Sequence, residues 1–410
     1  MLKLSLAIIS DLHIGETARA KDLCPHADYN GIEEKYIQKF IKFIEKEKIR
    51  ADYLIVPGDI TGKAHPAEFE LASNAICQIG NALNIPEEKI LFVPGNHDKV
   101  WKNLNSDEKE SAITNTAESY QFLKLDNWIF DRILRRSDHY MLSENCIAIW
   151  NFDDLIVVGY NSSWHDHSAA KPHHGLVTES SLHWLEEQLI NTAQLNLKVK
   201  IFLVHHHPFP YSDPISDWPD HSIMTNSENL LNLLNKFKFD LFLHGHKHIP
   251  RFKSHVSDSG FPLIVLGAGS FSYQLGYSYN GHASNLFHLL EIDGRDEETE
   301  YIAGCLRNWS FHSGHGWKLS SKHDGIMPRI GFGTHTTHNE IKKKLIPIIR
   351  SNLEHANYVK WKDLVSNDSK LKYLSPERVI SVLKEIATEE GLEYWGDDPE
   401  NSFLLPKDSA

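Results

Sequence analysis

The chain of 410 residues contains only four cysteines, and they stand far apart, at Cys24, Cys77, Cys146 and Cys305. They form no C-x-x-C pair, so we expect unpaired thiols in a reducing compartment. Long apolar runs are also missing, because none approaches the ~18 residues of a membrane-spanning helix. The first residues, Met1–Ser5, lead into an expected strand and lack the pattern of a signal peptide. These absences predict a cytosolic protein without a membrane partner.

Basic charge is scarce as well. Lysine and arginine number 42 against 55 aspartates and glutamates, and the formal net charge is −13. Such a balance argues against a general nucleic-acid-binding surface, which would be basic. It does not exclude a small phosphate pocket, because bound metals can reverse the local sign of the charge. Histidine, in contrast, is abundant, with 26 residues.

The first hundred residues alternate between strand-like and helix-like segments. Apolar runs at 3–10, 53–57 and 90–94 predict buried strands, and the spacing at 31–48 and 66–83 predicts helices between them. This β-α-β-α-β order is typical of a layered α/β fold, in which ligands bind beyond the carboxyl ends of the strands. The length predicts one large domain plus a smaller one.

The later chain divides into an insertion, further strands, a linker and a tail. Residues 99–145 interrupt the alternation and predict a cap insertion, after which strands resume within a main domain at 1–320. Residues 321–338 are rich in Gly, His, Thr and Ser, which is typical of a linker. A small C-terminal domain is expected at 339–410.

Three helices and a hairpin are expected in the C-terminal domain. The helices fall at about 339–353, 359–366 and 376–390, and the strands of the hairpin at 392–395 and 402–405. This set resembles a winged-helix domain, and a generic α+β tail is the alternative. Its mixed, slightly acidic charge favours a protein partner over DNA.

Five polar motifs carry the chemistry, and each follows a short apolar run. They offer carboxylate, amide and imidazole side chains at the ends of expected strands, which is what two neighbouring divalent transition metals require. The motifs are Asp11-Leu12-His13, Gly58-Asp59, Gly95-Asn96-His97-Asp98, His205-His206-His207-Pro208 and Gly245-His246-Lys247-His248.

In order and in type, the motifs resemble the calcineurin-like metallophosphoesterase superfamily, whose pattern reads D-x-H, G-D, G-N-H-[DE], H and G-H-x-H. The resemblance covers about residues 1–320. It implies a four-layer α/β/β/α sandwich and a dinuclear site that holds Mn²⁺, Fe or Zn²⁺. It also implies hydrolysis of a phosphodiester or phosphomonoester by a hydroxide that bridges the metals.

The resemblance assigns a role to each matching position. One metal would be held by Asp11, His13 and His248, the second by Asn96, His206 and His246, and both by Asp59. The first of two histidines before proline is usually the ligand, which indicates His206, with His205 as the alternative and His207 facing the substrate.

Two further residues would take part in the chemistry. His97 resembles the general acid that protonates the leaving alkoxide. Asp98 would orient His97 and fix its tautomer.

The segments around Gly58-Asp59 and His205–Pro210 resemble the cyclic-nucleotide phosphodiesterase-like branch, so a small-molecule or cyclic-nucleotide phosphodiesterase is the leading hypothesis. A metal-dependent nuclease is the alternative, favoured by Arg132, Arg135 and Arg136. A protein phosphatase would carry arginine directly after its G-N-H-E motif, where this chain has lysine. A non-catalytic regulatory member would have lost metal ligands, and every ligand type is present here.

Other residues near the motifs have two interpretations each. Glu68 fits a helix start better than catalysis. A group of histidines fits a solvated loop better than a pocket rim, and three aromatic residues fit packing better than stacking on a base. The histidines are His165, His167, His173 and His174, and the aromatic residues are Trp101, Trp164 and Tyr211.

Overall fold

The computed structural model describes residues 3–26, 28–29, 31–100, 111–125, 128–166, 173–211, 222–256, 260–334 and 336–407. The chain divides into two compact units. The larger contains residues 5–289 and 309–326, and the smaller contains residues 1–4, 290–308 and 327–410. Trp101 and His167 lie outside the described residues.

The first sheet begins with three parallel strands, β1 (Leu4–Ile8), β2 (Tyr53–Val56) and β3 (Ile90–Phe92). Its strand order is β12-β11-β10-β1-β2-β3, and β13 pairs with β11. The remaining strands of this sheet are β10 (Asn285–Arg295), β11 (Ile302–His312), β12 (Gly316–Leu319) and β13 (Arg329–Phe332).

The second sheet has the order β4-β5-β6-β7-β9-β8. Strands β5, β6, β7 and β9 run parallel, so their carboxyl ends lie at one edge. The six strands are β4 (Ile147–Asn151), β5 (Leu155–Tyr160), β6 (Val199–Val204), β7 (Leu241–His244), β8 (Arg251–Val256) and β9 (Pro262–Gly267).

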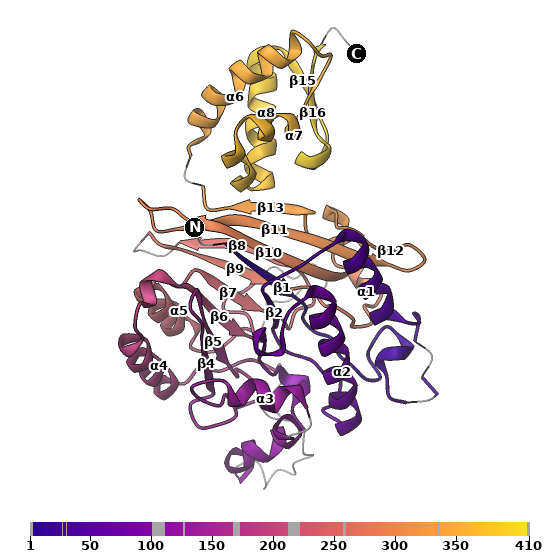
Figure 1. The fold of residues 1–410 in the computed structure, drawn as a ribbon, viewed down its shortest axis with the longest axis vertical. Helices are drawn as coiled ribbons and strands as arrows, with labels where there is room; N and C mark the ends of the chain where they lie inside the picture. Colours follow the sequence, from indigo (N-terminus) through magenta and orange to yellow (C-terminus); the bar gives the residue numbers. More distant parts are fainter. Residues whose placement is uncertain are drawn as a thin grey trace. The chain divides into compact units, whose positions relative to one another are not determined.

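Helices cover the outer faces of the two sheets. Helices α1 (Tyr36–Glu47) and α2 (Pro66–Leu83) lie on the outside of one sheet, and α4 (Glu179–Asn191) and α5 (Ser227–Lys236) on the outside of the other (Figure 1). Helix α1 buries one apolar face, formed by Tyr36, Ile37, Phe40 and Ile44. The α/β/β/α sandwich expected for the main domain is therefore confirmed.

The described part of the expected cap insertion contains a 3₁₀ helix and an α-helix. Residues Ser111–Lys124 form a 3₁₀ helix, η4, and a separate α-helix, α3, spans Ile129–Arg135. The backbone N–H of Val100 donates to the carbonyl of Ser119 at 2.9 Å, which ties this insertion to the chain that follows the third motif.

The smaller unit contains the three expected helices and the hairpin. The helices are α6 (His338–Leu353), α7 (Trp361–Asn367) and α8 (Pro376–Glu390), and the strands β14 (Val359–Lys360), β15 (Leu392–Trp395) and β16 (Phe403–Pro406) form a sheet of order β14-β16-β15. Ile341, Leu345 and Ile349 of α6 share one buried cluster with Val379 and Leu383 of α8. The winged-helix assignment stays a prediction.

The segment expected to be a linker contains a strand. Residues 329–332 form β13, which pairs antiparallel with Gly304–Arg307 of β11. The domain boundaries at 320 and 339 stay a prediction. In the part of the chain that the structure describes, no helix combines the length and the apolar character needed to cross a membrane.

Candidate metal centre

The polar motifs follow the carboxyl ends of five strands, as the sequence predicts. Asp11 and His13 follow β1, Asp59 follows β2, and Asn96 follows β3 in the first sheet. In the second sheet, the histidine run follows β6, and His246 and His248 follow β7. The two sheets together therefore supply one buried centre.

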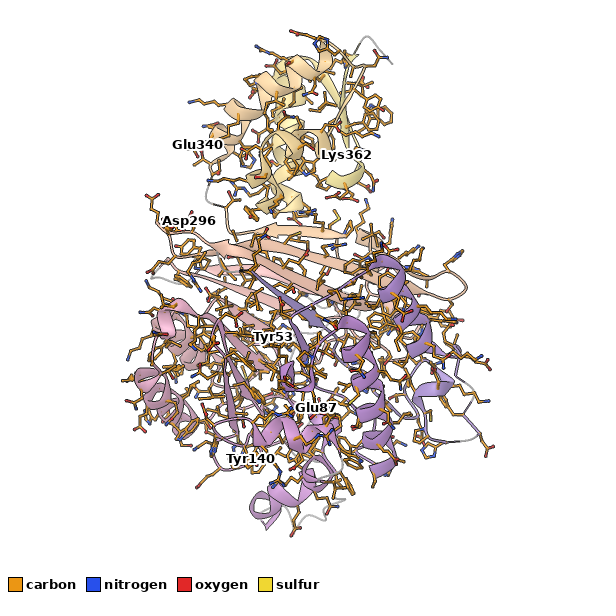
Figure 2. All side chains as sticks on the ribbon, viewed as in Figure 1. Tyr53, Glu87, Tyr140, Asp296, Glu340 and Lys362 are labelled. Carbon is orange, nitrogen blue, oxygen red and sulfur yellow. The ribbon has the colours of Figure 1, made fainter. Side chains whose placement is uncertain are left out.

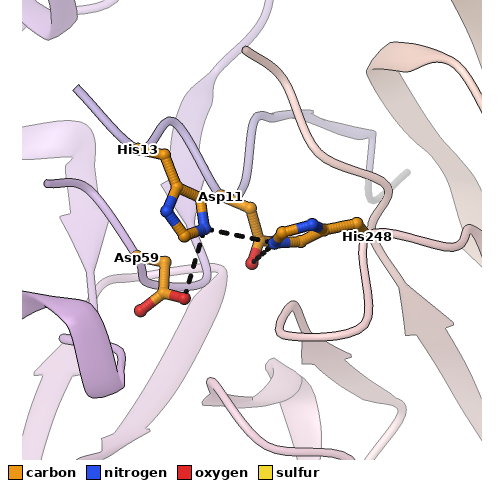
Figure 3. A group of neighbouring side chains, drawn as sticks. All are labelled: Asp11, His13, Asp59 and His248. Atoms are coloured by element: carbon orange, nitrogen blue, oxygen red, sulfur yellow. Dashed lines mark hydrogen bonds and ion pairs between the residues drawn. The ribbon is translucent and has the colours of Figure 1, made fainter. Parts of the chain in front are cut away.

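Four side chains from three motifs converge in this centre. Ligand atoms of Asp11, His13, Asp59 and His248 all lie within 4.8 Å of one another, and all four residues are buried (Figure 3). The Nε2 atom of His13 lies 3.4 Å from Oδ2 of Asp59 and 3.1 Å from Nε2 of His248. The Nε2 atom of His248 lies 3.4 Å from Oδ1 of Asp11. Two carboxylates and two imidazoles facing one point match the donor set of a divalent transition metal.

Backbone strain gathers at the same positions. Asp11, His13, Asp59, His246 and His248 have φ angles of 50°, 49°, 48°, 75° and 57°, in the left-handed region that non-glycine residues rarely adopt. Such a residue costs of order 1–3 kcal/mol and persists only when its surroundings hold it in place. Strain of this kind is concentrated at functional sites.

Hydrogen bonds from neighbouring loops hold the strained segment. The backbone N–H groups of Asp11 and His13 donate to the carbonyls of Gly58 and Asp59, both at 3.0 Å. The hydroxyl of Ser270 donates to the carbonyl of Asp11 at 2.8 Å. Ser270 comes shortly after the end of a parallel strand, β9. The same position after a strand identified the other site residues, but the sequence analysis did not select Ser270.

Gly58 is required for this close approach. Its φ angle is +101°, and a Cβ at this position would lie only 2.5 Å from Nδ1 of His205. The turn between β2 and Asp59 therefore brings the backbone against a histidine ring from the other sheet.

Several donor atoms in the centre are buried without a hydrogen-bond partner among the described residues. They are Oδ2 of Asp11, Nδ1 of His13, Nε2 of His205, Nε2 of His206 and Nδ1 of His248. Leaving a buried polar group unsatisfied costs about 1–3 kcal/mol. A metal ion would supply the missing partner of those atoms that face the other ligands; in His13 and His248 the atom that faces them is Nε2 rather than Nδ1.

A second group of side chains adjoins the first. The Nδ1 atom of His246 lies 3.2 Å from the amide Oδ1 of Asn96. The Nε2 atom of His205 lies 3.2 Å from Oδ2 of Asp59, and the ring centroids of His205 and His246 are 5.1 Å apart. Asp59 therefore faces both groups, which is the position that a bridging ligand needs.

The hydrogen bonds of the histidine run orient the rings of both His205 and His206, so they do not test the preference for His206 made from the sequence. The Nδ1 atom of His205 lies 2.8 Å from the carbonyl of Pro57, so Nδ1–H donates there and Nε2 faces Asp59. His206 instead lies with Nδ1 2.7 Å from the hydroxyl of Ser162. A ring held by a backbone carbonyl and aimed at the carboxylate has the usual arrangement of a metal-bound histidine.

Burial and neighbouring charge shift the pKa values of these groups in opposite directions. Burial lowers the pKa of His13 to about 3 despite the nearby Asp59 carboxylate. Burial also acts against protonation of His205, but the carboxylate of Asp59 outweighs it and raises the pKa of that ring to about 9. The pKa of Asp59 itself is well below its usual value, because the His205 and His97 rings outweigh the effect of burial. The anionic form of Asp59 is the form that binds cations.

The family model for calcineurin-like phosphoesterases matches residues 4–250. The chain belongs to this family. It is therefore a hydrolase acting on phosphate esters, and the family resemblance inferred from the five motifs is confirmed. The match ends before β8, so residues 251–410 lie outside it.

Two curated bacterial proteins resemble the phosphoesterase over most of their own length. One, from Psychrobacter arcticus, is 24% identical over 60% of this chain and 74% of its own. The other, from Xenorhabdus bovienii, is 24% identical over 55% of this chain and 71% of its own. Both are named probable cyclic nucleotide phosphodiesterases.

Solved structures also resemble the phosphoesterase, at low identity. A purple acid phosphatase from yellow lupin is 14% identical with a TM-score of 0.43, and the match covers 77% of this chain and 52% of that one. A 5'-nucleotidase precursor from Thermus thermophilus is 11% identical with a TM-score of 0.40, over 75% of this chain and 54% of that one.

The side chains of His97 and Asp98 have different hydrogen-bond partners. The Nδ1 atom of His97 lies 2.9 Å from the carbonyl of Gly62, which therefore orients the ring. Asp98 accepts hydrogen bonds from the backbone N–H groups of Ile60, Thr61 and Gly95 at 3.1, 2.8 and 2.9 Å. The expectation that Asp98 orients His97 is thus not met by these contacts. Asp98 instead clamps the loop that carries Asp59 against the loop that carries Asn96.

Glu68 is a helix-start residue, as expected. Its carboxylate accepts from the backbone N–H groups of Lys63 at 2.8 Å and His65 at 3.2 Å, and it completes the capping box of α2. These hydrogen bonds give Glu68 a structural role at the N-terminus of α2.

The arginines that favoured a nuclease are paired with acidic residues. Glu87, labelled in Figure 2, accepts from Nε of Arg132 at 2.8 Å and from Arg136 at 3.2 Å. Arg135 pairs with Asp131. This cluster is therefore a set of ion pairs on α3, which weakens the case for a basic groove.

The aromatic residues expected to pack do so where the structure describes them, and the histidines are expected in a solvated loop. Trp164 stacks on Tyr120 at 5.7 Å, and Tyr211 stacks on His207 at 5.3 Å. His173 pairs with Asp166 through Nδ1 at 3.1 Å, and His165 is exposed.

Sequence analysis missed a lysine beside the third motif. Lys99 is buried, with 5% of its surface exposed. Its ammonium donates to the carbonyls of Ser163 at 3.4 Å, Trp164 at 3.1 Å and Asp166. Lys99 thus joins the loop of Asn96 to the loop after β5, and its adjacency to the motif was the available signal.

Proposed function

We propose that this phosphoesterase hydrolyses a small phosphodiester of the cyclic-nucleotide type with two divalent metal ions as cofactors. The observation that carries the proposal is the convergence of buried donor atoms without partners around Asp59. The two bacterial relatives named probable cyclic nucleotide phosphodiesterases support the substrate class.

The proposed ligands divide between two positions. Asp11, His13 and His248 would hold the first metal, Asn96, His205 and His246 the second, and Asp59 both. The neutral amide of Asn96 leaves the pair of ions with net positive charge, which attracts phosphate. Oxygen and imidazole donors are consistent with Mn²⁺, Fe or Zn²⁺. When bound, such ions generate a nucleophile from water near neutral pH and neutralise charge on the phosphoryl oxygens.

His97 is the proposed proton donor. Its ring lies edge-on to the ring of His13, with centroids 4.7 Å apart, so it borders the centre. The carbonyl of Gly62 accepts from Nδ1–H, which leaves Nε2 as the atom that would pass a proton to the leaving alkoxide. Asp98 contributes indirectly, because its hydrogen bonds fix the loops of Asp59 and Asn96 relative to each other.

Hydrolysis by metal-stripped protein, with and without Mn²⁺, tests the proposal. The substrates are 3',5'-cyclic AMP, bis-p-nitrophenyl phosphate and the monoester p-nitrophenyl phosphate. We expect metal-dependent cleavage with a preference for the diesters. Cleavage of none of them by protein shown to contain two metals per chain would refute the proposed activity.

The residues assigned to this chemistry all belong to the larger unit. A winged-helix domain at 339–410, a protein partner bound through it, and a cytosolic location are proposals carried by composition and by the order of elements. The acidic net charge and the paired arginines on α3 do not favour a nuclease.

A further inference from the structure

Two tyrosine rings lie beside the proposed metal ligand His248. The ring centroid of Tyr273 is 4.3 Å from that of His248 and 4.7 Å from that of His13. The centroid of Tyr279 is 6.3 Å from that of His248. Both tyrosines are partly exposed, whereas His13 and His248 are buried. The metal centre therefore has an aromatic border on the side of His248.

The backbone around Tyr273 is fixed by hydrogen bonds. Its N–H donates to the hydroxyl of Ser270 at 2.8 Å. Its carbonyl accepts from the side-chain amide of Asn285 at 3.0 Å and from the N–H of Leu275 at 2.9 Å. Ser270 also bonds to Asp11, so the ring is attached to the same framework that positions a metal ligand.

Tyr279 is held in a comparable way. It ends the short 3₁₀ helix η6 (Tyr277–Tyr279), and its carbonyl accepts from the N–H groups of His282 at 2.9 Å and Ala283 at 3.0 Å. Tyr277, in the same turn, is 94% exposed and serves as an internal comparison. Rigid aromatic surfaces next to a phosphate site favour stacking, because little conformational entropy is lost on binding.

We propose that Tyr273 and Tyr279 stack against the aromatic base of a nucleotide whose phosphate lies at the metal centre. They would thereby select nucleoside phosphodiesters over diesters that lack a base. This inference rests on the proposed function and adds to it the residues that would contact the base. Stacking requires only a π-face, so we expect little preference among the four bases. Two other aromatic residues of the neighbourhood, Trp164 and Tyr211, are engaged in packing.

A pair of matched substrates tests the inference. Adenosine 3',5'-cyclic phosphate and methyl ribofuranoside 3',5'-cyclic phosphate share the cyclic ester and differ in the base. With Mn²⁺ bound, we expect Tyr273→Leu and Tyr279→Leu each to raise KM for the nucleotide about tenfold, as when one aromatic surface is removed from a stacked base. KM for the base-free ester should not change.

The control variants are Tyr277→Leu and Tyr273→Phe. The first removes an exposed ring from the same turn, and the second keeps the ring that stacks. Both should retain the KM of the wild type for both substrates. An equal loss on both substrates in Tyr273→Leu would assign the ring to positioning His13 and His248. No change in either leucine variant would also overturn the inference.

A binding measurement separates this inference from the proposed activity. Calorimetry with metal-loaded protein compares adenosine 5'-monophosphate with ribose 5-phosphate, and neither requires turnover. Tighter binding of the nucleotide that is lost in both leucine variants supports stacking even if no diester is cleaved. Equal affinity for the two ligands overturns stacking even if cyclic esters are cleaved.

Discussion

Replacement of Asp59 by asparagine tests the metal centre most directly, because this carboxylate faces both groups of ligands. Its Oδ2 atom lies 3.4 Å from Nε2 of His13 and 3.2 Å from Nε2 of His205. Its Oδ1 atom accepts from the backbone N–H of His97 at 2.9 Å. Asparagine has the same shape and can keep this last hydrogen bond. The substitution therefore removes the negative charge while leaving the loop in place.

The charge determines the size of the expected effect. An amide offers one neutral oxygen where the carboxylate offers two anionic ones, so it cannot join two cations with comparable affinity. The loss of one catalytic electrostatic contact costs about 2.7–4 kcal/mol in typical hydrolases, and this change affects both ions. We expect turnover to fall by at least about 10³-fold at Mn²⁺ concentrations that saturate the wild type. Metal content should fall below two per chain.

Steady-state kinetics and elemental analysis of the same preparations measure both quantities. Asp240→Asn is the matched control, because Asp240 is a buried carboxylate that accepts from the N–H of Lys200 at 2.9 Å at the start of β7. It loses the same charge outside the centre and should keep two metals and wild-type turnover. Turnover of Asp59→Asn within tenfold of the wild type, with two metals bound, would refute the bridging role.

Four further predictions follow from particular contacts. His97→Ala should retain both metals but slow cleavage more for alkoxide than for p-nitrophenolate leaving groups. His205→Ala should bind one metal fewer, whereas His206→Ala should bind both. Burial lowers the pKa of Lys99 from 10.5 to about 8, so between these pH values the unfolded chain binds more protons. The free energy of unfolding of the wild type, minus that of Lys99→Met, should therefore rise with pH between about 8 and 10.5. The slope should reach up to about 1.4 kcal/mol per pH unit. Ser375→Ala should lower stability by about 1 kcal/mol by removing the cap of α8, with turnover unchanged.

Each of these predictions has a result that would contradict it. An equal loss of rate on all leaving groups would remove His97 from proton transfer. Normal metal content in His205→Ala together with a loss in His206→Ala would restore the assignment made from the sequence. A pH-independent difference in stability over this range, measured by denaturant unfolding, would mean that burial does not lower the pKa of Lys99. Ser375→Asp, which keeps a capping oxygen, should retain stability, and a loss there equal to that of alanine would argue against capping.

Elements with strong local signals could be predicted from the sequence. Helix α8 begins where Ser375-Pro376 places an N-cap before a proline at the first helical position, and its bounds agree with the expected 376–390. Helix α2 likewise begins at Pro66 with Glu68 in its first turn. The convergence of the proposed metal ligands could be predicted because each stands directly after a buried strand, where parallel strands bring loops together.

Contacts between loops could not be predicted in this way. Three adjacent histidines are equivalent as a sequence, and only the carbonyl of Pro57 and the hydroxyl of Ser162 distinguish His205 from His206. Asp98 stands next to His97 in the chain, yet its carboxylate turns to the N–H groups of Ile60 and Thr61. Neighbours in sequence indicate which loop a side chain belongs to, but not the partners it meets from another loop.

Strain and unsatisfied donors at the same residues have a common explanation. Asp11, His13, Asp59 and His248 combine left-handed backbone with burial, and three of them hold polar atoms without partners among the described residues. Either feature alone would destabilise the fold, and together they persist only because Asp98, Ser270 and the glycine turns hold the loops in place. A chain selected only for stability would relax these residues or replace them with apolar ones. These residues instead lie together in one buried place, and they are the ligand types of the family. This combination is the physical argument that the centre binds metal ions.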